Sequence, residues 1–63
     1  MNTSLLGKNN QMVRRALKDA GMYQWQLAEL AGVTEVTVSR WFRHELPLEV
    51  QNELVALIRK GAS

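Results

Sequence analysis

The residues from 35 to 43 divide into two sets by their spacing. Val38, Trp41 and Phe42 are three and four positions apart, which puts them on one side of a helix. The opposite side then carries charged, hydrogen-bonding and apolar side chains: Glu35, Val36, Ser39, Arg40 and Arg43. Arginine can donate two hydrogen bonds to guanine, serine can pair with several base edges, a carboxylate can accept from cytosine, and valine can pack on a thymine methyl group. These side chains could therefore read base edges, although charged residues on a helix more often form an ordinary solvated face.

Two other pairs of residues have side chains that act as catalysts in enzymes. Glu49 and Glu53 are four residues apart, as paired carboxylates can be, but this spacing is more typical of an exposed helix face. Ser39 and His44 do not share a face of a short helix, and no acidic residue is in position to orient the histidine. We expect that the protein is not an enzyme and has no small-molecule substrate.

The composition limits the chain to one small domain. It has 63 residues, of which 46% are hydrophobic and 22% charged. With no cysteine and a single histidine, disulfides and the common zinc and copper sites are excluded, so we expect no metal and no other cofactor. The formal net charge of +2 is compatible with a nucleic-acid partner. We find no signal-peptide core and no apolar run near the ~20 residues needed to span a bilayer, and therefore expect a cytoplasmic protein.

Apolar periodicity and two glycines predict the first half of an all-α fold. Residues 1–7 are expected to form a flexible arm, and residues 8–63 the folded domain. An apolar stripe predicts a helix from about Asn10 to Ala20, ended by Gly21 in the left-handed conformation. Its members are Val13, Ala16, Leu17 and Ala20. A second helix is predicted over 24–31, with Gly32 as its stop and an inner face of Leu27, Ala28 and Leu30.

Two further helices are predicted in the second half. The β-branched run at 36–38 also admits a strand, but its spacing favours a helix from Glu35 to about Arg43, with Thr34 as the N-cap. A fourth helix is predicted from about Pro47 to Lys60, ending near Gly61. Its apolar stripe consists of Val50, Leu54, Leu57 and Ile58.

The two short central helices have the sterics of a helix-turn-helix. Ala28 provides a small residue where they cross, Gly32 lets the chain reverse, and Val33 fills the turn. Residues 24–43 resemble the motif of the lambda-repressor-like family, which includes the Cro and Xre-type regulators. The residues that carry the resemblance are Gln24, Leu27, Ala28, Gly32, Val33, Val38 and Trp41. With the flanking helices, the resemblance spans roughly residues 10–60.

The resemblance implies a compact four-helix fold that binds double-stranded DNA in a sequence-specific way. The protein would be a transcriptional regulator, a Cro/C1-type repressor of phage or mobile-element origin, with residues 35–43 as the recognition helix in the major groove. Contacts to DNA bases are then expected from Glu35, Val36, Ser39 and Arg40. Contacts to phosphate are expected from Gln24, Thr34, Thr37 and Arg43. A homodimer on half-sites about 34 Å apart is also expected, with the last helix as the interface.

The sequence departs from the family pattern in three places. Tyr23 stands where a serine or threonine usually caps the second helix, and His44-Glu45-Leu46 replaces a basic turn. Glu35 stands where a neutral side chain is more usual, so it contacts a base or only balances the helix dipole. For Arg40 and Arg43 the alternative is an ordinary solvated face. The alternative function is a protein-interaction module that retains the helix-turn-helix scaffold.

Overall fold

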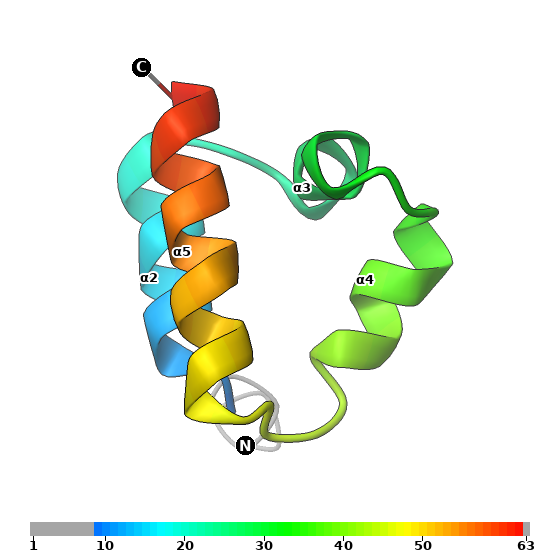
Figure 1. Ribbon diagram of the computed structural model, residues 1–63. Coiled ribbons are helices and arrows are strands. Elements are labelled where there is room, and N and C mark those ends of the chain that lie inside the picture. Colours follow the sequence, from blue (N-terminus) through cyan, green and yellow to red (C-terminus); the bar gives the residue numbers. More distant parts are fainter. Residues whose placement is uncertain (1–8, 63) are drawn as a thin grey trace, which may run out of the picture.

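A computed structural model describes residues 9–62 of the chain, so the arm predicted for residues 1–7 lies outside the described residues. Four helices and no strand are present in this range (Figure 1). They are α2 (Gln11–Ala20), α3 (Gln24–Ala31), α4 (Glu35–Trp41) and α5 (Leu48–Ala62). The all-α prediction is confirmed, and residues 35–41 are helical despite their β-branched side chains.

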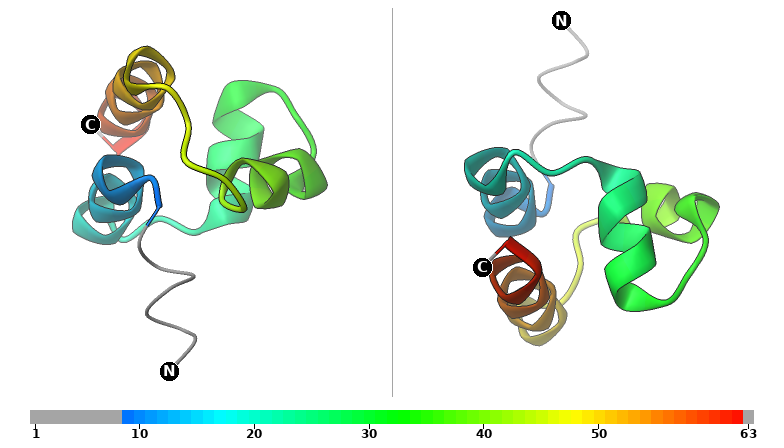
Figure 2. Two further views of the ribbon diagram at one scale, coloured as in Figure 1. Left: turned by 90° about the horizontal axis from the view of Figure 1, so that it is seen from below. Right: turned by 90° about the horizontal axis from the view of Figure 1, so that it is seen from above.

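The helices form two pairs. Helices α2 and α5 lie side by side and run in the same direction, while α3 and α4 lie together on one side of that pair (Figures 1 and 2). Helix α3 packs against both α4 and α5, and so joins the two pairs. The core draws side chains from all four helices and from the residue after α4: Val13, Leu17, Leu27, Ala28, Val38, Phe42, Leu54 and Ile58. The buried Ala28 fits the small residue predicted for the α3–α4 crossing.

The glycine stops predicted at Gly21 and Gly32 are confirmed. Gly21 and Gly32 have φ angles of 64° and 72°, in the left-handed region that glycine adopts at little cost. The residue after each glycine donates its backbone N–H back into the helix, Met22 to the carbonyl of Leu17 at 2.9 Å and Val33 to that of Ala28 at 3.0 Å. These hydrogen bonds satisfy carbonyl groups at the ends of α2 and α3. The chain turns at each glycine, before and after α3.

The ends of α4 and α5 differ from the prediction. Helix α4 stops at Trp41 rather than near Arg43, because Phe42 leaves helical geometry with φ −85° and ψ 3°. Helix α5 continues through Gly61, which was predicted to end it. At Gly61 an added Cβ would lie only 2.5 Å from Cδ1 of Leu30, so the absence of a side chain permits a close approach between the helices. Leu30, predicted for the inner face of α3, does lie against α5, but it is 39% exposed and is not part of the core.

A buried polar cluster holds the loop between α4 and α5. Asn10 is 0% exposed, and its side chain lies against this loop, which the sequence did not indicate. Gln51 of α5 is 3% exposed and donates from Nε2 to the carbonyl of Leu46 at 2.9 Å and to Oε2 of Glu45 at 2.7 Å. Buried polar groups persist in a core only when they are paired, and these contacts meet that condition. The loop is thereby anchored from α5 as well as from the residue that precedes α2.

Candidate nucleic-acid interface

The four residues predicted to contact bases lie on the exposed side of α4. Glu35, Val36, Ser39 and Arg40 are all exposed, whereas Val38 on the opposite side is fully buried. The residue spacing therefore predicted correctly which side of α4 is buried and which is exposed. Val36 is 62% exposed. This surface combines an acceptor, a hydroxyl, an apolar group and a guanidinium within two turns of helix.

The amino end of α4 is capped by its own sequence neighbours. Oγ1 of Thr34 accepts the backbone N–H of Thr37 at 3.3 Å, and the two hydroxyl oxygens are 3.1 Å apart. The N-cap predicted at Thr34 is thus confirmed. Each hydroxyl group already has a hydrogen-bond partner within the chain. Contacts from Thr34 and Thr37 to phosphate would therefore need a further hydrogen bond from these groups. Glu35 lies in the first turn, where a carboxylate favours the helix dipole.

The amino end of α3 is closed in a different way. The backbone N–H of Tyr23 donates to Oε1 of Gln26 at 2.8 Å, and the N–H of Gln26 donates to the carbonyl of Tyr23 at 3.0 Å. Gln26 therefore supplies the side-chain bond at this end, so the tyrosine at the cap position does not prevent an ordered start. Gln24, the predicted phosphate contact, is half-buried in the first turn, and its sequence neighbours Tyr23 and Trp25 are both exposed.

Arg43 and the loop that follows lie at the other end of α4. Arg43 is exposed and lies two residues beyond the last helical residue, so it belongs to the loop rather than to the helix where it was predicted. Its backbone N–H donates to the carbonyl of Arg40 at 3.1 Å, which keeps it close to the last turn. Arg40 and Arg43 together give this end of the exposed side two guanidinium groups.

Other kinds of site receive little support within residues 9–62. No group of three or more histidine, cysteine or acidic side chains in this range could hold a metal ion. Glu49 and Glu53 are exposed on α5, and Ser39 and His44 are exposed as well. In the same range, no helix is both long and apolar enough to cross a membrane.

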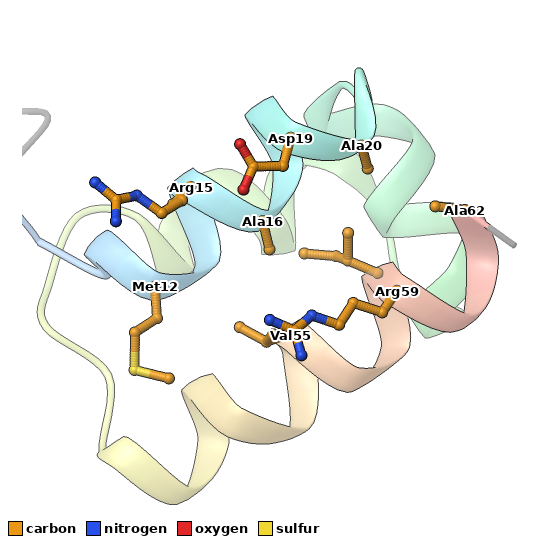
Figure 3. A pocket seen from close by; sticks show the side chains of 9 residues that line it. Met12, Arg15, Ala16, Asp19, Ala20, Val55, Arg59 and Ala62 are labelled. Carbon is orange, nitrogen blue, oxygen red and sulfur yellow. The ribbon is translucent and has the colours of Figure 1, made fainter.

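A shallow, largely apolar groove runs between α2 and α5 (Figure 3). Met12, Ala16 and Ala20 line it from α2, and Val55, Ile58 and Ala62 from α5. Arg15 and Asp19 of α2 and Arg59 of α5 also line it. Because Val13 and Leu17 of α2 point into the core, the groove uses the neighbouring face of that helix and none of the side chains of α4.

Comparison of the chain with protein-family models, with curated proteins and with solved structures found no match in any of the three. The fold class follows from the four helices, but the assignment to the lambda-repressor-like family stays a prediction. It depends on the motif residues within 24–43 and on two short helices, α3 and α4, joined by the turn at residues 32–34.

Proposed function

We propose that the protein is a sequence-specific double-stranded DNA-binding transcriptional regulator, a Cro/C1-like repressor of phage or mobile-element type. The observation that carries this proposal is the exposed side of α4, where Glu35, Val36, Ser39 and Arg40 share one surface while the other side of the helix packs into the core. Helix α4 then enters the major groove as the recognition helix. Such a repressor works in the cytoplasm.

Each exposed side chain has a matching feature on a base pair. Arg40 donates two hydrogen bonds to O6 and N7 of guanine, a pairing worth about 1–3 kcal/mol of discrimination. Val36 packs on the methyl group of thymine, and Ser39 bonds to a neighbouring base edge. Glu35 either accepts from N4 of cytosine or acts only on the helix dipole, and its substitution by glutamine distinguishes the two.

The phosphate contacts surround this surface. Gln24 at the amino end of α3, Thr34 and Thr37 at the amino end of α4, and Arg43 beyond its carboxyl end are the proposed contacts. Hydroxyl, amide and guanidinium groups all donate to phosphate oxygens, and contacts of this kind fix the register of a protein on the duplex. Binding through them weakens steeply with salt, because each neutralised phosphate releases counterions.

A second copy of the chain completes the proposed complex. Helix α4 has only seven residues, so one domain covers a short stretch of groove, and two copies on half-sites about 34 Å apart would cover more. The proposed contact is the last helix, with Leu46, Leu48 and Val55; Leu48 is exposed, and the other two are half-buried. Sedimentation at high micromolar concentration checks this point, and a monomer mass there would contradict it.

Selection of bound duplexes from a random pool tests the proposed function. At about 150 mM salt, which suppresses purely electrostatic binding, we expect the purified protein to enrich an inverted repeat. Arg40→Ala should relax one guanine position in each half-site, whereas Lys60→Ala, which removes the same charge from an exposed position near the end of α5, should not. A pool without enrichment would contradict the proposal.

A protein-interaction module is the second candidate. A carboxylate at Glu35 repels phosphate, and the exposed Val36, Tyr23 and Trp25 would suit a protein surface. This candidate predicts no binding to duplex DNA even at low salt, whereas a regulator of the proposed kind binds any duplex there.

A further inference from the structure

The carboxyl end of α4 is closed by side chains from a distant part of the sequence. None of residues 42–46, which directly follow this helix, is a glycine, and its C-cap residue, Phe42, is not in the left-handed conformation. The last carbonyl groups of a helix nevertheless need partners when they are shielded from water. Asn10 and Arg14, which precede this end by about thirty residues, supply two of those partners.

Asn10 binds three backbone groups of the segment that leaves α4. Its Nδ2 donates to the carbonyl oxygens of Trp41 at 2.8 Å and His44 at 3.0 Å, and its Oδ1 accepts the N–H of Leu46 at 2.7 Å. Its own N–H donates to Oε1 of Glu45 at 2.9 Å. The backbone of Asn10 has a φ of 54°, a left-handed conformation that asparagine tolerates better than most residues. Both ends of the side-chain amide and the backbone N–H are therefore engaged with this one segment.

Arg14 binds the same segment one turn further along α2. Its Nη2 donates to the carbonyl oxygen of Phe42 at 3.3 Å, and its guanidinium carbon lies 4.7 Å from the centroid of the Phe42 ring. That distance allows a cation–π contact. The guanidinium is itself oriented by Asn9, which accepts Nε at the backbone carbonyl, 2.7 Å away, and Nη2 at Oδ1, 2.8 Å away. Arg14 is thus part of the packing around Phe42.

These contacts set the orientation of a helix that cannot be stable alone. Helix α4 has seven residues, below the ~12–15 at which isolated helices become marginally stable, so its order depends on tertiary contacts. Val38 and Phe42 anchor one side in the core, and Asn10 and Arg14 fix the exit. Arg40 lies in the last turn, directly before the fixed carbonyls.

On the basis of the proposed function, we propose that Asn10 and Arg14 are positioning residues for DNA recognition. They act as a C-cap supplied by the first turn of α2 and the residue before it, and this cap holds the last turn of α4 and residues 42–46 in one arrangement. Arg40 and Arg43 then present their guanidinium groups at a fixed angle. Bidentate contacts to a base need such fixed geometry, whereas non-specific contacts to phosphate tolerate its loss.

Asn10→Gly tests the proposal, because glycine keeps the left-handed backbone and removes the amide. At a temperature where circular dichroism shows the variant folded, we expect its affinity for the duplex selected by the wild type to fall about tenfold, as the loss of one well-formed bidentate contact would. Affinity for a scrambled duplex and the dependence of binding on salt should not change, because the phosphate contacts remain. Amide hydrogen exchange at residues 42–46 should become faster.

Arg14→Lys provides a second variant with a matched control at the next residue. Lysine keeps the charge but loses the planar fork that reaches both Asn9 and Phe42. We expect part of the loss in specific affinity seen for Asn10→Gly, and no loss for Arg15→Lys at an exposed position.

The outcomes separate this proposal from the proposed function. A folded Asn10→Gly variant with an unchanged ratio of specific to non-specific affinity would overturn the positioning role, even if its melting temperature fell. Unchanged hydrogen exchange at residues 42–46 would overturn the C-cap itself, whether or not DNA binds. If the wild type selects no sequence, the proposed function fails and the positioning role fails with it, while faster exchange in the variant would still establish the cap.

Discussion

The two ends of α4 are closed by different means. At the amino end, Thr34 accepts the N–H of Thr37, three residues away. At the carboxyl end, Asn10 and Arg14 of a distant segment bind the carbonyl groups of Trp41 and Phe42, at separations of 31 and 28 residues. The first arrangement is local and can be predicted from the sequence, whereas the second exists only when the chain has folded. The difference implies that the amino end tolerates change better than the carboxyl end.

The largest loss of stability is expected when the Asn10 contacts at the carboxyl end of α4 are removed. Asn10→Leu would leave the buried polar partners of the amide unpaired, at roughly 1–3 kcal/mol for each group. We expect a loss of about 3–5 kcal/mol in the free energy of unfolding, enough to unfold much of a small domain. Urea denaturation measures it, with Asn52→Leu at an exposed position of α5 as the control. Equal stability of the two variants would contradict the role of Asn10.

The second prediction concerns Arg40 on the exposed side of α4, where a substitution should weaken DNA binding and leave stability almost unchanged. Arg40→Ala removes a guanidinium from an exposed position, so its free energy of unfolding should change by about 0.5 kcal/mol or less. Its affinity for the selected duplex should fall by about 1–3 kcal/mol. Fluorescence anisotropy with a labelled duplex measures the affinity. Wild-type affinity would mean that Arg40 belongs to an ordinary solvated face.

Removing the cap at the amino end of α4 should lower the free energy of unfolding less than removing the Asn10 contacts at its carboxyl end. Thr34→Ala removes the side-chain acceptor for Thr37 N–H, and such substitutions cost about 1 kcal/mol of stability. Thr34→Ser keeps the hydroxyl and serves as the control. Thermal unfolding of the three proteins checks the order. A loss for Thr34→Ala as large as that for Asn10→Leu would contradict the contrast between the two ends.

The smallest effect concerns Glu35. Glu35→Gln removes a carboxylate from the first turn of α4, which should lower stability by about 0.3–1 kcal/mol at low ionic strength through the helix dipole. The same change should raise the affinity for a scrambled duplex, because a negative charge near phosphate is lost. Duplex selection with the variant decides the base contact: a lost preference for one cytosine would mean that Glu35 reads it.

Local signals in the sequence predicted much of the fold. The periodic apolar residues predicted the four helices, Gly21 and Gly32 predicted the ends of α2 and α3, and Thr34 predicted the N-cap of α4. Each of these signals acts within a few residues. The exposed side of α4 followed from the same periodicity.

Long-range contacts account for what was missed. Asn10 precedes a helix, a position where polar residues usually cap and remain near the surface, and its partners lie 31–36 residues away. The glycine at 61 looked like a helix stop, but its role depends on Leu30 from another helix. Gln51 is polar and buried because Glu45 and Leu46 fold back onto α5. No spacing rule within one element reveals such pairs.

An NMR titration with the selected duplex tests the central claim most directly. With backbone amides assigned and salt at about 150 mM, non-specific contacts are weak enough for the specific surface to dominate. We predict that the largest shifts occur at residues 34–43 and at the amino end of α3, and that the amides of Met12, Ala16 and Ala20, which line the groove between α2 and α5 from the side of α2, change little. Shifts confined to that groove, or no shifts at all, would contradict the assignment of α4 as the DNA-binding helix.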